Sequence, residues 1–304
     1  MTSNTPKKIT IAFDLYGTIL STGSITEALS THLGGNHPQA EAVSAKWRQY
    51  QLEYTWRITA MGAYEPFDSI TRAALRHAAA EELGPDGLPD GVVDELMRSY
   101  DSLGVFPDVV PALETLKKRD EGRRARRGEG ERSSGGGGEE PGDSTSDKET
   151  EIEVEAVIFS NGTEAMLRNS IDTSPDLKPF RDDGQDQYRG GPGLFRRLVT
   201  LHDARTYKPS PLSYSHLRGE AGAGPGEALV WLVSANPFDV VGARSAGLPA
   251  AWIDRAGTGW VDRLGDVIFG VGGDDDDARR RRARPTVIAK GVDEAVGEIL
   301  RLGI

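Results

Sequence analysis

Ile9-Thr-Ile-Ala-Phe-Asp14-Leu-Tyr16-Gly-Thr18 begins as a short apolar run and ends in a turn that carries a carboxylate. An apolar run of this length, followed by turn residues, predicts a buried β-strand. In an open α/β sheet, the carboxyl ends of the strands form the crevice where ligands bind. Asp14 is therefore the first candidate functional residue. The tyrosine two positions later, where a second carboxylate could stand, favours a nucleophile that works without a metal.

Further apolar runs at residues 156–159, 198–201, 228–233 and 250–253 predict four more buried strands. They lack strict alternation and are separated by helical patterns, as in a parallel sheet covered on both faces. We expect helices over residues 109–118, 164–170, 211–218, 239–246 and 292–300. The predicted fold class is α/β, with a doubly wound parallel sheet as its core.

The segment between the first strand and residue 104 has a helical pattern, with Trp47, Gln51, Tyr54 and Ile58 at helical spacing. We expect residues 21–104 to form a helical cap domain that closes over the strand ends, and residues 1–20 and 105–304 to form the core. Charged or Gly-rich stretches at 120–152, 172–193 and 272–285 predict disordered inserts in core loops.

The chain of 304 residues carries 36 Lys and Arg against 47 Asp and Glu, a formal net charge of -11. This balance, with the basic residues scattered, argues against nucleic acid as a partner. The sequence contains no cysteine, which excludes thiolate zinc sites and cysteine nucleophiles. No run approaches the roughly 18 apolar residues of a membrane span. We expect a soluble, cytoplasmic protein.

Polar motifs follow four of the predicted strands. They are Asp14-Leu-Tyr-Gly-Thr18, Ser160-Asn161-Gly162, Tyr207-Lys208-Pro209 and Ser234-Ala-Asn236-Pro-Phe-Asp239. Because parallel strands end at one edge of the sheet, the four motifs should converge on a single crevice. An ionised aspartate beside hydroxyl and ammonium donors can attack an electrophilic carbon and form an ester. We therefore predict that Asp14 is the nucleophile, that Lys208 is its cationic partner, and that Thr18 and Ser160 donate hydrogen bonds to Asp14 or to a substrate carboxylate.

The order aspartate, serine, lysine, aspartate resembles the four motifs of the haloacid dehalogenase superfamily. Within it, the cap segment Trp47-Arg48-Gln49-Tyr50-Gln51-Leu52-Glu53-Tyr54-Thr55-Trp56 resembles the cap helix of the L-2-haloacid dehalogenases. The resemblance covers most of the chain outside the three inserts. It implies hydrolysis of short L-2-haloalkanoic acids to 2-hydroxy acids with inversion, no cofactor or metal, and a homodimer as a plausible assembly.

The resemblance also assigns roles to individual residues. It implies that Asp239 helps Lys208 to position or activate the water that cleaves the ester, while Ser234 and Asn236 line the opposite strand end. It implies that Arg48 and Asn161 stabilise the departing halide. The remaining expected pocket residues are Tyr16, Gln49, Leu52, Phe67, Tyr214 and Phe238. Ala235 and Phe238 stand where relatives often have serine and tryptophan, which leaves the pocket shape open.

Two alternatives stay open at this point. A magnesium-dependent phosphatase of the same superfamily would normally carry a general acid where Tyr16 stands, and a tyrosine with a pKa of about 10 cannot do that work. Ser234 and Asn236 also stand where a phosphatase would place a metal-binding carboxylate. The second alternative is a non-catalytic protein that binds a small carboxylate on this scaffold.

Overall fold

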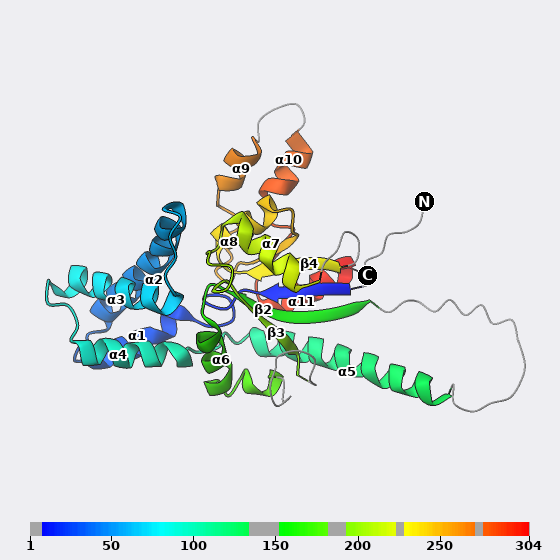
Figure 1. The fold of residues 1–304 in the computed structure, drawn as a ribbon, viewed down its shortest axis with the longest axis horizontal. Helices are drawn as coiled ribbons and strands as arrows, with labels where there is room; N and C mark the ends of the chain where they lie inside the picture. Colours follow the sequence, from blue (N-terminus) through cyan, green and yellow to red (C-terminus); the bar gives the residue numbers. More distant parts are fainter. Residues whose placement is uncertain (1–7, 134–151, 182–192, 223–227, 271–275, 304) are drawn as a thin grey trace, which may run out of the picture.

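A six-stranded parallel sheet forms the centre of the molecule (Figure 1). The computed structural model describes residues 8–133, 152–181, 193–222, 228–270 and 276–303. The strands are β1 (Lys8–Phe13), β2 (Glu153–Ser160), β3 (Phe195–Thr200), β4 (Ala228–Ser234), β5 (Ala250–Ile253) and β6 (Val287–Ala289), in the order β3-β2-β1-β4-β5-β6. The predicted α/β class is confirmed. From β1 the chain adds β2 and β3 on one side and then returns to add β4, β5 and β6 on the other side. Folds of this type bind ligands at the carboxyl ends of the strands where the strand order switches sides.

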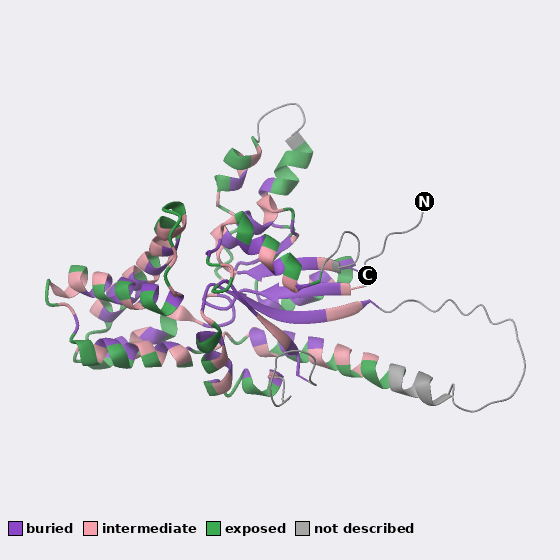
Figure 2. Ribbon diagram, in the orientation of Figure 1, coloured by how far each residue is buried: buried purple, intermediate pink, exposed green. Residues whose placement is uncertain are grey.

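Helices cover both faces of the sheet. Ile9, Ile11 and Phe13 of β1 face α5 (Val109–Ser133) and α11 (Val292–Gly303), whereas Ala12 faces α7 (Pro211–Glu220) and α8 (Pro237–Ser245). Successive strand residues point to opposite faces, so strands buried on both sides read as continuous apolar runs. Figure 2 shows the central strands β1 and β2 as mostly buried between these layers, whereas the edge strand β3 is half intermediate in burial.

The chain between β1 and α5 consists of helices that lie beyond the carboxyl end of β1 (Figure 1). These are η1 (Thr22–Ser24), α1 (Ile25–His32), α2 (His37–Ala60), α3 (Phe67–Leu83), α4 (Asp90–Ser99) and η2 (Tyr100–Ser102). An antiparallel bridge joins Leu20 to Val105 where the chain leaves the sheet and returns to it. The backbone N–H of Ser21 donates to the Gly104 carbonyl at 2.7 Å on the outer side of this bridge.

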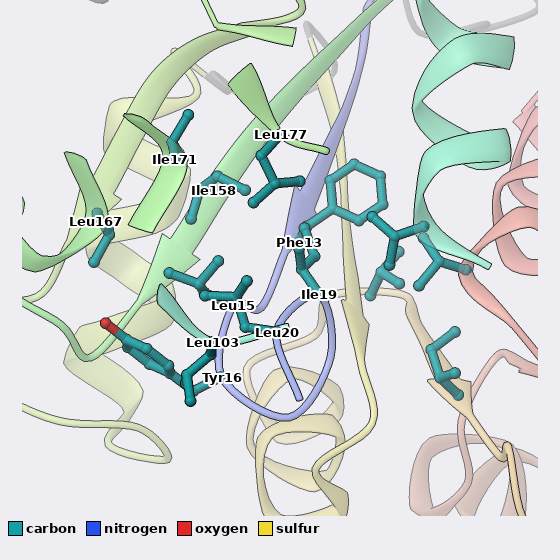
Figure 3. Packing of buried hydrophobic residues seen from close by; sticks show 14 of the residues in the cluster. Phe13, Leu15, Tyr16, Ile19, Leu20, Leu103, Ile158, Leu167, Ile171 and Leu177 are labelled. Carbon is teal, nitrogen blue, oxygen red and sulfur yellow. The ribbon is translucent and has the colours of Figure 1, made fainter. Parts of the chain in front are cut away.

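One hydrophobic cluster runs from the sheet into these helices. Figure 3 shows Phe13, Leu15 and Ile19 within it, at the end of β1. The same cluster includes Trp47 of α2 and Phe67 of α3, both buried. Burial of apolar area contributes about 25 cal/mol per Å². The helical segment is therefore held against the strand ends by packing as well as by its two chain connections.

The predicted disorder is wrong for residues 120–133, which continue α5 as a helix. It is also wrong for the part of the third insert that forms α10 (Asp276–Ala283), next to α9 (Leu264–Phe269). The second insert includes the end of α6 (Glu164–Thr173) and η3 (Lys178–Phe180). Ion pairs explain the longer α5, since Asp120 lies 2.8 Å from both Arg124 and Arg196. The rest of the predicted inserts, at 134–151, 182–192 and 271–275, lies outside the described residues.

Candidate active site

The register of the sheet places the polar motifs at one edge. Phe13 of β1 pairs with Ile158 of β2 on one side and with Val233 of β4 on the other. Asp14 and Ser234 follow these paired residues and so come level with each other. The backbone N–H of Asp14 donates to the Val233 carbonyl at 2.9 Å, which fixes the start of the turn.

The turn after β1 folds back on itself through Gly17. Its φ of 88° lies in the left-handed region, which a glycine adopts without the steric cost that a side chain would add. The Gly17 N–H donates to the Leu20 carbonyl at 2.7 Å. This geometry returns the Thr18 hydroxyl to Asp14, to whose Oδ2 it donates at 2.7 Å. Because Thr18 Oγ1 also accepts from the Ala235 N–H, its own hydrogen is directed at the carboxylate.

Three donors converge on Oδ2 of Asp14. Besides Thr18, Asn236 Nδ2 donates at 2.7 Å and the Ser234 hydroxyl at 3.3 Å. The Ser234 oxygen accepts from the Asn236 backbone N–H, so its hydrogen too is left for the carboxylate. Asp14 is 6% exposed. A buried carboxylate needs such donors in place of water, and here they also fix its orientation.

Lys208 lies between two carboxylates and is itself buried. Its ammonium donates to Asp14 Oδ1 at 3.0 Å, to Asp239 Oδ2 at 2.8 Å and to the Phe159 carbonyl at 2.8 Å. All three of its hydrogens therefore have acceptors. The backbone N–H of Lys208 donates to Asn161 Oδ1 at 3.0 Å, which ties the second and third motifs together.

Asp239 is completely buried at the start of α8. The hydroxyl of Tyr214 on α7 donates to its Oδ1 at 2.8 Å. Burial raises the pKa of Asp239 above that of an exposed aspartate, and the Lys208 ammonium opposes this rise, while the Asp14 charge adds to it. The Tyr214 hydrogen bond stabilises the ionised form and lowers the pKa of Asp239.

Arg48 reaches the strand ends from α2. Its Nη2 donates to the Tyr16 carbonyl at 3.1 Å and to Asn236 Oδ1 at 3.2 Å, and its Nη1 donates to Gln51 Oε1 at 2.7 Å. The guanidinium is half-buried. Asn236 thus accepts from Arg48 with its Oδ1 and donates to Asp14 with its Nδ2, so its amide links the two charged side chains.

Aromatic rings form a wall beside this group. Tyr16 is buried and stacks on Phe67, with ring centroids 5.8 Å apart, and it lies 5.3 Å from the Tyr100 ring. Its hydroxyl has no hydrogen-bond partner within the described chain. Burial raises the pKa of Tyr16 far above that of a free phenol, so the side chain is an apolar surface and no source of protons. Phe238 packs edge-on against Trp56 of α2, at 5.4 Å.

Some predicted residues are placed differently from the expectation. The Ser160 hydroxyl accepts from the Gly162 N–H at 3.1 Å, and the structure has no hydrogen bond between Ser160 and Asp14 among the described residues. Gln49 is exposed and Leu52 is half-buried. No hydrogen bond of the described residues ties these two to the carboxylates, and their place in the pocket stays a prediction.

Sequence reasoning missed two participants. The Phe159 carbonyl is the third acceptor of the Lys208 ammonium, and only the position of the strand end could have suggested it. Trp56 of α2 packs against Phe238 of α8, although Trp56 is 40% exposed. This contact joins the helical segment to the sheet-containing part of the molecule. An exposed tryptophan on a helix expected to cover the site is the signal that points to such a contact.

The described residues contain neither a metal-binding cluster nor a helix that could span a membrane. Within the described ranges, no three or more histidine, aspartate or glutamate side chains are arranged to hold a metal ion. Among the described helices, none combines the length and apolarity that crossing a bilayer requires.

Comparison with known proteins places this geometry in a family. No family model matches the chain. The haloacetate dehalogenase H-2 of Moraxella sp. (strain B) is 30% identical over 261 residues, which are 85% of this chain and 91% of that protein. The (S)-2-haloacid dehalogenase H-109 of Pseudomonas putida is 30% identical over 84% of this chain and 89% of its own length.

Solved structures agree at the level of the fold. The L-2-haloacid dehalogenase of Xanthobacter autotrophicus superposes with a TM-score of 0.64 at 22% identity, over 97% of this chain and 98% of that one. A second structure of that enzyme, with chloropropionic acid covalently bound, gives a TM-score of 0.63 at 23% identity, with the same coverage. The sequence relationships together with this fold show that the chain belongs to the family of (S)-2-haloacid dehalogenases.

Proposed function

We propose that the protein hydrolyses the carbon–halogen bond of short L-2-haloalkanoic acids, with Asp14 as the nucleophile. The observation that carries the proposal is the environment of this carboxylate. Oδ2 has three donors, whereas the Lys208 ammonium is the one donor to Oδ1 among the described residues, so Oδ1 keeps a lone pair for attack. A guanidinium, Arg48, lies near enough to share the Asn236 side chain with it.

In the first half of the reaction, Asp14 Oδ1 attacks C2 of the substrate from the side opposite the halide. The new carbon–oxygen bond forms as the carbon–halogen bond breaks, and the halide leaves with the electron pair. Arg48, with the amide hydrogens of Asn161, stabilises the negative charge that develops on the halide. The ester retains the inverted configuration at C2.

In the second half, water attacks the carboxyl carbon of the Asp14 ester. Asp239 accepts the proton and Lys208 stabilises the charge that develops on the ester oxygen. The bond between the carboxyl carbon and the ester oxygen then breaks, and the proton passes from Asp239 to the alkoxide oxygen that leaves. This returns Asp14 as a carboxylate and releases the 2-hydroxy acid. Asp239 suits this task because it is held 2.8 Å from the Lys208 ammonium and is shielded from bulk water.

The phosphatase alternative is disfavoured by the donors around Asp14. A phosphatase of this kind needs a cation on the carboxylate and oxygen ligands beside it. Here Asn236 Nδ2 donates one hydrogen to Asp14 Oδ2 and the other to the Tyr16 carbonyl, so an N–H dipole faces a carboxylate oxygen that a metal would need as a ligand. Lys208 occupies the other side of the Asp14 carboxylate. For the non-catalytic alternative, no observation of the described residues speaks in its favour.

The decisive test is a single turnover of L-2-chloropropionate in heavy-oxygen water with enzyme in excess. The ester mechanism predicts stoichiometric chloride, a product that has gained no label, and heavy oxygen in the Asp14 peptide by mass spectrometry. Label found only in the product would refute the ester route. Binding of the acid without chloride release would support the non-catalytic alternative.

Replacing Tyr214 with phenylalanine is expected to move the acid limb of the rate profile to higher pH. The variant loses the hydrogen bond that lowers the pKa of Asp239, so this carboxylate protonates at a higher pH and stops accepting protons from water. At neutral and alkaline pH the rate should stay close to that of the parent enzyme. The measurement is kcat against pH for both proteins.

Tyr54→Phe is the matched control for this profile, since the Tyr54 hydroxyl bonds His77 on the cap helices and not Asp239. An acid limb at the same pH in Tyr214→Phe and in the parent protein would show that Asp239 does not govern it.

The compartment and the assembly belong to the same proposal. We place the enzyme in the cytoplasm, because a chain without cysteines makes no use of disulfides and fits a reducing compartment. A homodimer, as the resemblance implies, is checked by light scattering of the purified protein. The expected substrate of the enzyme is a small haloacid, and we expect no nucleic acid partner.

A further inference from the structure

We infer that Gln51 is a positioning residue of the dehalogenation: it holds the Arg48 guanidinium in the orientation that faces the Asp14 strand end. The inference rests on the proposed function, because the orientation of Arg48 affects the reaction only if a halide leaves toward it. Gln51 follows Arg48 by three positions on α2, so both side chains lie on the same side of the helix.

Gln51 is 1% exposed, and its amide is bonded on both sides. Its Oε1 accepts from Arg48 Nη1 at 2.7 Å, and its Nε2 donates to Thr71 Oγ1 at 2.8 Å on α3. The Tyr100 hydroxyl lies 3.1 Å from Nε2 and 3.2 Å from Oε1. A buried side chain with this many partners has one orientation available.

The direction of each bond follows from the partners. A guanidinium can only donate, so the atom that faces Arg48 must be the amide oxygen. The Thr71 hydroxyl donates to the Phe67 carbonyl at 2.6 Å and therefore meets Gln51 with a lone pair. Neither side allows the amide to turn over, and the acceptor stays directed at Arg48.

The helix that carries Arg48 is fixed at the same point. Trp47 precedes Arg48 and donates from its indole Nε1 to the Thr71 carbonyl at 2.8 Å. The Tyr100 ring lies 5.3 Å from the Trp47 ring and shields the amide from water. Thr71 thus binds both Trp47 and Gln51, which sets the rotation of α2 relative to α3.

The neutrality of Gln51 matters as much as its position. Within the described chain, the hydrogen-bond acceptors of Arg48 are Gln51, the Tyr16 carbonyl and Asn236, and none is a carboxylate. Neutral acceptors orient a guanidinium without cancelling its charge. The full positive charge therefore stays available for an anion, as a leaving halide requires.

The test compares Gln51→Leu and Gln51→Glu with the parent enzyme, by single-turnover bromide release from L-2-bromopropionate. Gln51→Leu should slow bromide release by roughly tenfold to a hundredfold, since a hydrogen bond to a charged group is lost. In steady-state assays of the same variants, the loss should fall on kcat, with little change in KM, because the contact acts on the departing halide.

Gln51→Glu gives a readout that a merely structural role would not move. At low pH the protonated acid can replace the amide, with its carbonyl toward Arg48 and its hydroxyl toward Thr71. As pH rises, the carboxylate pairs with Arg48 and neutralises it, so the rate should fall at a pH where the parent rate does not. The comparison is made within one folded protein, so it holds even if Gln51→Leu fails to fold.

Thr55→Val is the matched control, a buried polar residue one turn further along α2 that donates to the Leu52 carbonyl. It should keep the parent rate. If the parent enzyme releases bromide and both Gln51 variants match it at every pH, the positioning role is wrong and the proposed function stands. If the parent releases none, the proposed function fails and this inference fails with it.

Discussion

Halide release is expected to fall by about four orders of magnitude or more when Asp14 is replaced with asparagine, as when the nucleophile of a catalytic unit is removed. The amide is nearly isosteric with the carboxylate, but its neutral oxygen does not displace a halide from carbon. Lys208 keeps Asp239 and the Phe159 carbonyl as acceptors, so the site should stay assembled. The measurement is chloride released from L-2-chloropropionate over long incubations.

Asp90→Asn controls for the loss of an acidic residue as such, since Asp90 is an exposed side chain paired with Arg76 on the cap helices. It should release chloride at the parent rate. Thermal unfolding of both variants separates loss of the nucleophile from loss of the fold. Chloride release by Asp14→Asn at a rate near that of the parent would overturn the mechanism.

Replacing Lys208 with methionine is expected to lower both activity and stability. The variant leaves Asp14 and Asp239 buried near one another with no cation between them, a change that typically costs about 3–5 kcal/mol. Without Lys208, the pKa of Asp239 rises further, because the ammonium is what opposes the effect of burial. We expect the rate to fall by about a thousandfold or more, since a buried charge that stabilises the transition state is lost.

The stability part of this prediction is measured by urea unfolding. Adding Asp239→Asn to Lys208→Met removes one of the two unpaired carboxylates. This double variant should recover much of the lost unfolding free energy while its chloride release stays low. A Lys208→Met variant as stable as the parent protein would show that the ammonium does not balance these charges.

The sequence predicts the sheet and the meeting of the motifs well, because both follow from simple rules. Buried parallel strands are apolar runs, and their carboxyl ends share an edge. The Lys208 ammonium accordingly donates a hydrogen bond to Asp14 and another to Asp239. The three-residue strand β6 (Val287–Ala289) was missed because a run so short carries almost no periodic signal.

Composition misled where charged residues are helical. The Arg- and Glu-rich stretch after residue 118 has the low hydrophobicity typical of disorder, yet most of its residues are good helix formers, and it has charge pairs one turn apart. The pair Asp120 and Arg124 is one of these. Low hydrophobicity shows that a segment does not enter the core, but it does not show that the segment lacks a helix.

Hydrogen-bond direction was the other limit. Sequence places Ser160 after a strand, but only the backbone turn reveals that its oxygen accepts from Gly162. Gln51 was assigned only to the helical pattern of the cap, because nothing local distinguishes a glutamine that packs from one that orients an arginine. Such roles depend on residues far away in the sequence, here Thr71 and Tyr100.

The bridge between Leu20 and Val105 bears on how this family can diversify. The chain leaves the sheet at Leu20 and returns at Val105, and these two residues are paired. The helical segment between them therefore connects two neighbouring points, as a tight turn would. Lengthening or exchanging a loop between fixed ends costs little entropy. Selection for another substrate could therefore replace the inserted helices as a block, including Arg48, while Asp14 and Lys208 are inherited unchanged.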